Sequence, residues 1–278
     1  MEKTKPSLTK PEQKFIETVW EHYRAKGRHD LPWRHTTDPY KILVSEIMLQ
    51  QTQVSRVLPK YKEFLKLFPN TKKLAEATLG DVLKAWQGLG YNRRAKFLKE
   101  AAEVVVSEHK GKWPKTVKGL QTLPGVGAYT AGAVMSFAYN EPVPLIETNV
   151  RTAYLHHFFK NQHGVPDSDL IPIIERTLDP RQPREWHWAL MDYGSHLKAT
   201  VGNLNTQSKS YKKQSDFKAS NRYIRGAIIR ELSKQPLTIQ KLFSKLSQMD
   251  SGRIELQLKV LLEENLLLKI GHQLSLPN

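Results

Sequence analysis

The chain has 278 residues, enough for one or two domains with their own cores, and its hydrophobic content of 39% is typical of a globular protein. Lys and Arg residues number 43 against 27 Asp and Glu, giving a net charge of +16. This charge favours a polyanionic partner such as nucleic acid over the alternative of lysines that only solvate the surface. The absence of cysteine excludes disulfides, thiol nucleophiles and cysteine-bound zinc or iron–sulfur clusters.

Helical patterns fill most of the chain before residue 199. Residues 11–26 place apolar side chains at helical spacing. Residues 38–51 follow, with Asp38 as the candidate N-cap and Pro39 at the first helical position. Further helical segments, separated by Pro, Gly and Asn, are predicted at residues 54–69, 71–77, 79–90 and 93–109. No alternating strand pattern stands out before about residue 265, so the sequence predicts an all-α fold.

The last third of the chain changes character. Residues 199–220 are polar and rich in Ser, Lys, Asn and Gln, as in an exposed linker or arm. Three helical segments and a hairpin at Gly271–His272 then follow, which is the pattern of a winged helix; a helical cap on the main domain is the alternative. The predicted domains are a helical domain of residues 1–204, a basic polar linker of residues 205–220 and a small winged-helix-like domain of residues 221–278.

A glycine-rich turn stands out in LPGVGAYTAGAV, residues 123–134. Gly125 and Gly127 flank Val126, and glycines allow a tight turn and a close approach of the backbone to a ligand. Amides at the start of the next helix attract a phosphate. A lone Gly-Val-Gly would indicate only a turn between helices. The full motif predicts a helix-hairpin-helix that holds the DNA backbone through Gly125, Val126 and Gly127.

Two glutamates have informative surroundings. Glu46 lies inside an apolar helix, and carboxylates are seldom buried without a partner or a function. An apolar setting would raise the pKa of Glu46 and make it a candidate general acid. Glu147 comes just before a helix that contains Asn149, so it is either a functional carboxylate or simply an N-terminal cap of that helix.

These motifs together resemble a known family. Residues 31–197 are similar to the helix-hairpin-helix (HhH-GPD) base-excision DNA glycosylase superfamily, which includes endonuclease III, and most of all to its adenine DNA glycosylase branch. The similarity rests on the sequences LPWR, DPY, SEIMLQQTQV, GLGY, LPGVGAYTAGAV, TNVR and MDYGSHL. It implies a two-lobed helical domain that flips a base out of duplex DNA and hydrolyses its N-glycosidic bond.

The resemblance implies a role for each matching residue. Glu46 would protonate N7 of the extruded adenine, and Glu147 would stabilise the sugar cation. Tyr129 and Asn149 would position this chemistry. The residues expected in the base pocket or wedged into the DNA helix are Trp33, Arg34, Gln51, Leu89 and Tyr91. Two carboxylates suit the reaction because the bond cleaves into a purine anion and a cationic sugar.

The chain also departs from the family. Tyr129 occupies the position of the lysine nucleophile of bifunctional relatives, so no strand cleavage by β-elimination is expected. Glu147 replaces an aspartate and adds a methylene group. Lys198 stands where the first cluster cysteine would fall, so we expect no iron–sulfur cluster, metal or other cofactor. The basic residues expected to contact the DNA backbone in place of the cluster loop are Lys209, Lys212 and Lys213.

The C-terminal domain with which the family inspects 8-oxoguanine is not expected, because residues 221–278 are too short for it. The leading hypothesis is a monofunctional glycosylase for mispaired adenine, including adenine opposite 8-oxoguanine. The alternatives are the same chemistry on hypoxanthine or mismatched thymine, and a catalytically weak DNA-binding relative. We expect a monomer that binds double-stranded DNA and no membrane. The N-terminal residues lack a signal-peptide pattern, so a cytoplasmic location, with the nucleoid in a bacterium, is expected.

Overall fold

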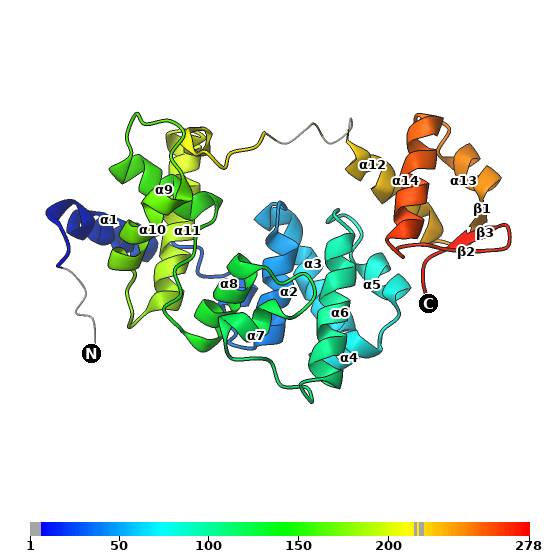
Figure 1. Ribbon diagram of the computed structural model, residues 1–278, viewed down its shortest axis with the longest axis horizontal. Helices are drawn as coiled ribbons and strands as arrows, with labels where there is room; N and C mark the ends of the chain where they lie inside the picture. Colours follow the sequence, from blue (N-terminus) through cyan, green and yellow to red (C-terminus); the bar gives the residue numbers. More distant parts are fainter. Residues whose placement is uncertain (1–6, 214–215, 217–219) are drawn as a thin grey trace. The chain divides into compact units, whose positions relative to one another are not determined.

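The computed structural model describes residues 7–213, 216 and 220–278 (Figure 1). Contacts between residues divide the chain into two compact units, each built from separated segments. Unit 1 comprises Met1–Ile42, Lys115–Lys118 and Gly127–Lys213, and unit 2 comprises Leu43–Pro114, Gly119–Val126 and Gln214–Asn278. The chain passes between the units within helices α2 (Pro39–Leu49) and α7 (Val117–Gln121), and also after Pro114, Val126 and Lys213.

Unit 1 is built of helices: α9 packs on α11 and α10, and α1 packs on α11 and α10 (Figure 1). Its elements are α1 (Lys10–Lys26), η1 (Pro32–Arg34), α8 (Ala128–Tyr139), α9 (Thr148–Phe158), α10 (Asp167–Thr177), α11 (Pro183–Thr200) and η2 (Leu204–Gln207). The predicted first helix begins at a capping box, in which Thr9 and Glu12 each bond the other's backbone. Aromatic packing fills the core: the Phe15 ring lies 4.9 Å from that of Tyr154 and 6.1 Å from that of Trp186.

Small side chains allow α8 to lie inside unit 1. Its residues 130–138 are all buried, and three of them are alanines. A side chain at Gly132 would come within 3.0 Å of Leu145, so glycine is needed for this close packing. The helix ends at Asn140, whose φ of 58° is the left-handed conformation that asparagine tolerates at a helix C-terminus.

The main helices of unit 2 are α3 (Val54–Leu67), α4 (Thr71–Glu76), α5 (Leu79–Ala85) and α6 (Arg93–Ser107). Asn70 and Thr78 cap α4 and α5 by accepting hydrogen bonds from backbone amides. Helix α6 packs against α4 and α5. Phe64 and Trp86 meet edge to face in the core at 5.8 Å between ring centres. Every helix predicted between residues 54 and 109 is therefore present.

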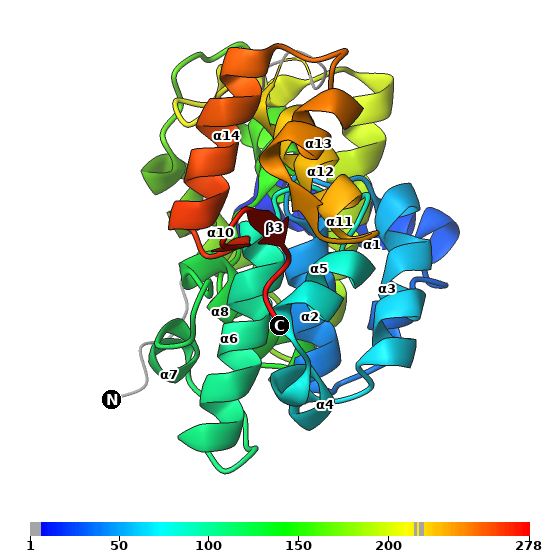
Figure 2. The same ribbon diagram turned by 90° about the vertical axis from the view of Figure 1, so that its right-hand side faces the viewer.

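The C-terminal part of unit 2 has the elements of a winged helix, in the predicted order (Figure 2). They are α12 (Asn221–Leu232), β1 (Leu237–Thr238), α13 (Ile239–Lys245), α14 (Ser251–Glu263), β2 (Leu268–Ile270) and β3 (Gln273–Ser275). The antiparallel sheet has the order β1-β3-β2, with Leu237 opposite Leu274 and Lys269 opposite Leu274 on the other side. The hairpin around Gly271–His272 is confirmed, whereas β1 was not predicted.

The segment after α11 differs from the exposed arm expected for residues 199–220. Part of it forms η2, where Asn205 is buried. The buried Ser208 follows η2 and forms an isolated backbone bridge with Val165. Residues 209–213 are exposed. Residues 214–215 and 217–219 of the predicted linker lie outside the described part of the chain, and the domain boundaries at 204/205 and 220/221 stay a prediction.

Candidate functional site

The Glu147 carboxylate is clamped at the start of α9. Its Oε1 atom accepts hydrogen bonds from the backbone amides of Asn149 and Val150, both at 2.8 Å. The Asn149 side chain donates to Oε2 at 3.3 Å. Glu147 is thus the N-cap that the sequence allowed as one alternative, and it brings the predicted pair Glu147 and Asn149 together. A cap fixes the position of a carboxylate, so capping and a chemical role are compatible.

The charge state of Glu147 reflects two opposing effects. Burial raises the pKa of this carboxyl group above its ordinary value, because the charged form loses hydration. The amides of Asn149 and Val150, and the positive charges of Arg151 and Arg28, oppose the rise. The amides fix the position of this carboxylate, and in its charged form it would stabilise a nearby positive charge.

A buried carboxylate, Asp192 on α11, holds two arginines of unit 1. Its oxygens accept from Arg34 at 2.8 and 2.9 Å and from the Arg28 side chain at 2.6 Å. The two arginine charges and their hydrogen bonds outweigh burial, so the pKa of Asp192 is lowered. Arg34, expected in the base pocket, therefore makes a bidentate ion pair with only 4% of its side chain exposed, and its neighbour Trp33 is also buried.

A glycine allows α11 to approach the start of α9 closely. A Cβ atom at Gly194 would come within 3.0 Å of the Asn149 backbone oxygen, which a side chain could not accommodate without moving the backbone. This explains the glycine in MDYGSHL: it sets the distance between α11 and the turn that carries Glu147 and Asn149.

Glu46 lies on α2 in unit 2 and is 8% exposed, among neighbours that are mostly apolar. Glu46 makes a hydrogen bond or another electrostatic interaction within the protein, so this buried carboxylate is not without a partner. The turn that follows carries Gln50 and Gln51.

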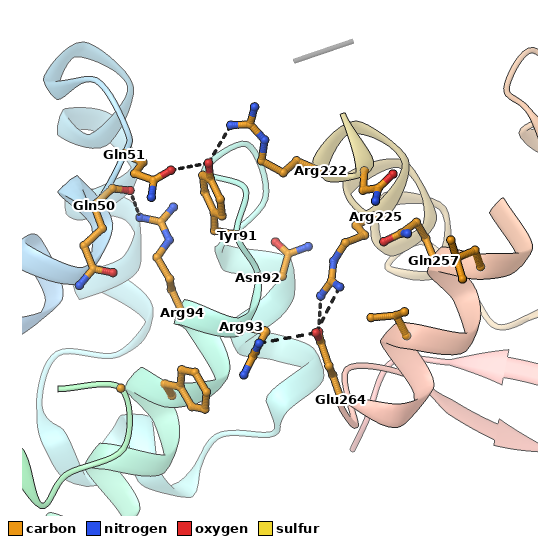
Figure 3. A pocket seen from close by; sticks show the side chains of 15 residues that line it. Gln50, Gln51, Tyr91, Asn92, Arg93, Arg94, Arg222, Arg225, Gln257 and Glu264 are labelled. Carbon is orange, nitrogen blue, oxygen red and sulfur yellow. Dashed lines mark hydrogen bonds and ion pairs between the residues drawn. The ribbon is translucent and has the colours of Figure 1, made fainter. Parts of the chain in front are cut away.

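The guanidinium of Arg94, at the start of α6, joins two loops of unit 2. It donates to the carbonyls of Ile47 and Met48 at the end of α2, and to those of Leu89 and Gly90, at distances of 2.7 to 3.1 Å. The carbonyl of Gln50 accepts from the same group (Figure 3). Burial lowers the pKa of Arg94 to about 10. Arg94 therefore ties the α2 turn to the GLGY loop.

These two loops present the predicted wedge residues. The hydroxyl of Tyr91 donates to the Gln51 side chain (Figure 3). Both residues have left-handed backbones, with φ of 54° at Gln51 and 49° at Tyr91, and such strain is concentrated at functional sites. Leu89, by contrast, is buried. Its side chain does not project as that of Gln51 does, and its role as a wedge stays a prediction.

Of the two glycines in the hairpin motif, only Gly125 has a backbone conformation that favours glycine. Gly125 has a φ of 72°, and an added Cβ would come within 3.0 Å of Phe97. Val126 is buried. Gly127 is the N-cap of α8, is exposed, and has open space where a Cβ would lie. Tyr129 is half-buried on the first turn of α8.

The residues after α11 do not fit an iron–sulfur cluster. The whole chain has no cysteine, and in the part that the structure describes no three His, Asp or Glu side chains are grouped to hold a metal. Instead, the buried Asn205 side chain donates to the Thr148 carbonyl at 3.1 Å and to the Thr152 hydroxyl at 2.7 Å. Protein hydrogen bonds thus brace α9 from this segment. Lys209, Lys212 and Lys213 follow it and are exposed.

Sequence reasoning missed three residues that organise these regions: Asp192, Arg94 and Asn205. Asp192 lies in the MDYGSHL motif among mostly apolar residues, and this was the available signal, whereas Arg94 lies in a strongly charged stretch and carried none. Asn205 carried no signal, because it lies in a polar segment where a buried asparagine is not expected.

No helix in the described ranges has the length and apolar composition needed to span a membrane.

Comparisons with known proteins agree with this geometry. Residues 44–169 match the model of the HhH-GPD superfamily base excision DNA repair proteins. The chain is 46% identical over 147 residues to the adenine DNA glycosylase of Mycobacterium tuberculosis (strain CDC 1551 / Oshkosh), a match that covers 52% of this chain and 48% of the relative. It is 32% identical over 207 residues to that of Buchnera aphidicola subsp. Baizongia pistaciae, with 71% and 58% covered. The chain thus spans about half the length of the curated relatives it matches.

Solved structures show the same fold. A thermostable thymine-DNA glycosylase matches with a TM-score of 0.60 and 29% identity, covering 67% of this chain and 87% of that chain. A non-covalent endonuclease III–DNA complex matches with a TM-score of 0.52 and 18% identity, covering 69% and 86%. The mostly helical fold predicted from the sequence is confirmed. The resemblance to the HhH-GPD superfamily of base excision DNA repair proteins that the sequence predicted is confirmed over residues 44–169.

Proposed function

We propose that the protein is a DNA glycosylase of base excision repair that removes a mispaired adenine from double-stranded DNA. The observation that carries this proposal is the clamped carboxylate of Glu147 at the start of α9, in a chain whose relatives are named adenine DNA glycosylases. A fixed negative charge beside a sugar is what N-glycosidic cleavage requires.

The reaction assigns different tasks to the two glutamates. Glu46 gives its proton to N7 of the adenine while the bond between C1′ and N9 breaks, and the bonding electrons leave with the base. Glu147 stabilises the positive charge that develops on the sugar. Water then adds its hydroxyl to C1′, leaving an abasic site, and the released proton restores Glu46. Tyr129 and Asn149 position these groups, and Tyr129 in the lysine position supports a reaction without strand cleavage.

The DNA-binding elements serve different purposes. The hairpin of Gly125, Val126 and Gly127 would hold a phosphate through backbone amides, and Lys209, Lys212 and Lys213 would add sequence-independent contacts. Gln51 and Tyr91 would enter the DNA helix when the target base leaves the stack. The net charge of +16 supports binding to a polyanion.

One assay tests the function. Purified protein is incubated with duplexes that contain adenine, hypoxanthine, thymine or uracil opposite each partner base, and alkali then reveals abasic sites. Release of adenine from mispairs, with strand breaks only after alkali, is expected. Strand breaks without alkali, or an adduct trapped by borohydride, would contradict the monofunctional reaction.

A second candidate is excision of mismatched thymine. The solved structure with a TM-score of 0.60 is a thymine-DNA glycosylase, and its 29% identity supports more than a shared fold. The same panel separates the candidates, because thymine release from G·T mispairs without adenine release would favour the second. Release of no base would indicate a DNA-binding relative with lost activity.

A further inference from the structure

A cavity of about 860 Å³ lies in unit 2, between the loops that carry the wedge residues and helices α12 and α14 (Figure 3). Gln51, Tyr91 and Arg222 line one part of it, and Phe97 and the hairpin residue Gly125 line another. Amides, guanidinium groups and aromatic rings are the groups with which proteins bind unstacked nucleobases. The cavity therefore has the size and the chemistry of a nucleobase site.

The C-terminal wall of this cavity is held by contacts that do not involve Arg222. The Lys96 ammonium group donates to the Glu264 carbonyl at 2.7 Å. The Gly80 amide donates to the Pro277 carbonyl at 2.7 Å, and the Gln87 side chain bonds the hydroxyl of Ser233. A substitution at Arg222 is therefore expected to change the lining of the cavity without removing its wall.

Arg222 adjoins the wedge residues directly. Its Nη1 atom donates to the Tyr91 hydroxyl at 2.7 Å, and its guanidinium carbon lies 5.3 Å from the centre of the Tyr91 ring (Figure 3). Tyr91 bonds Gln51 in turn. A guanidinium has five N–H donors in a rigid fork, so it can hold Tyr91 and meet a base edge at the same time.

The other arginines of the lining are engaged differently. Arg225 is ion-paired with Glu264 within the C-terminal elements, and the guanidinium of Arg93 lies 3.9 Å from the same carboxylate. Glu264 thus neutralises positive charge at one end of the cavity, whereas the contact from Arg222 to Tyr91 is to a neutral hydroxyl. This difference singles out Arg222 as the guanidinium beside the wedge pair.

We propose that Arg222 reads the base left without a partner when the target base is extruded, and that it prefers a guanine-type purine. The proposal rests on the proposed function, because extrusion of one base leaves its partner unpaired. Guanine presents O6 and N7 as acceptors, the pair that arginine bonds in the commonest specific contact of DNA recognition. 8-Oxoguanine keeps the O6 carbonyl, whereas its N7 carries a hydrogen and donates, so O6 is the acceptor that the two bases share. At the corresponding position adenine and cytosine present an amino group, which donates a hydrogen bond. A guanidinium has only donors, so it cannot accept that bond.

The test measures binding and needs no catalysis. Duplexes carry a non-cleavable abasic analogue opposite guanine, 8-oxoguanine, 7-deazaguanine, adenine, cytosine or thymine, and affinity is measured by fluorescence anisotropy. The wild type should bind the guanine and 8-oxoguanine duplexes about 10-fold or more tightly than the cytosine duplex. Arg222→Ala should lose that preference, and Arg222→Lys, which keeps the charge without the fork, should not restore it. A lower affinity for the 7-deazaguanine duplex than for the guanine duplex would show that guanine N7 also accepts a hydrogen bond from Arg222.

The matched control is Lys259→Ala, which removes a positive charge from an exposed position of α14 outside the cavity lining. It should keep the preference, and thermal melts should show that all variants fold. An equal loss of affinity by Arg222→Ala for every duplex, or no preference in the wild type, would overturn the proposal. If the preference is present but no base is released in the excision assay, the proposed function fails and the reading role of Arg222 stands.

Discussion

The start of α9 in unit 1 and the Gln51–Tyr91 pair in unit 2 are built in opposite ways. Glu147 is held by backbone amides, by a helix that approaches at Gly194, and by the brace of Asn205 on α9. Gln51 is exposed and Tyr91 is half-buried, and both have strained backbones and are held by polar side chains. A rigid end suits bond cleavage, which tolerates little displacement, and a polar, strained pair suits insertion into DNA.

The largest expected effect comes from neutralising Glu147. Glu147→Gln should reduce single-turnover excision by about a thousandfold or more, because the amide cannot stabilise the sugar cation. The amide oxygen can still cap α9, so the variant should fold. Retention of wild-type excision by this variant would remove Glu147 from the mechanism.

The same variant has a predicted pH signature. The pKa of Glu147 is raised in the folded state, so the protonated side chain stabilises the fold. This stabilisation is fully present at pH values below the pKa of Glu147 in the unfolded chain, and it is lost as the pH rises through the pKa of Glu147 in the folded chain. Glu147→Gln carries no such group and should be at least as stable as the wild type at pH 7. Thermal melts at pH 5 and pH 8 measure this, and a marked loss of stability at pH 8 would contradict it.

The next effect concerns the spacing between helices. Gly194→Ala should destabilise the protein by about 1–3 kcal/mol and lower excision, because the methyl group meets the Asn149 backbone. Gly226→Ala is the matched control: this helical glycine has open space around it, and alanine should stabilise α12 by roughly 0.5–1 kcal/mol. Denaturant titrations of both variants measure these changes in the free energy of unfolding. Equal behaviour would mean that the close approach of α11 has no energetic importance.

On the wedge side, Arg94→Lys should cost about 1–3 kcal/mol of stability, since one ammonium group cannot satisfy the carbonyls that the fork now bonds. The two loops would separate, so DNA distortion should suffer more than cleavage of an already unpaired base. Comparing excision from duplex DNA with excision opposite a gap measures this. An equal reduction on both substrates would show that Arg94 does not act through the loops.

The smallest effect is expected from the exposed lysines. Changing Lys209, Lys212 and Lys213 together to alanine should weaken binding of all duplexes alike and flatten the dependence of log affinity on log salt by up to about three units. Base preference should not change, because phosphate contacts carry no sequence information. A salt titration with an unchanged slope would show that these lysines only keep the segment soluble.

Local signals in the sequence predicted much of this fold. The Asp38 side chain accepts from the amide of Tyr40 at the start of α2, and the hairpin at Gly271–His272 is present, since caps and turns depend on neighbouring residues. The strand β1 has only two residues and so shows no alternation. The ion pair of Arg28 with Asp192 joins residues 164 positions apart, and no local pattern predicts such a partner.

The candidate site divides in the same way. The clamp between Glu147 and Asn149 could be predicted, because a helix start brings an N-cap and the next amides together. The burial of Leu89, the ion pair of Arg34 and the contact between Arg222 and Tyr91 could not, because each depends on how distant segments pack. The polar composition of the segment at Asn205 predicted exposure, yet its hydrogen bonds allow burial.

One experiment tests the proposed division of tasks between the start of α9 and the Gln51–Tyr91 pair most directly. It combines stopped-flow fluorescence, with 2-aminopurine in place of adenine, and single-turnover excision. Glu46→Gln and Glu147→Gln should keep the rapid fluorescence rise of base extrusion while excision is lost, since neither carboxylate is needed to unstack the base. Tyr91→Ala should slow the rise itself and retain excision from a substrate that is already unpaired. Loss of the rise in both glutamate variants, with a normal rise in Tyr91→Ala, would contradict the division of tasks.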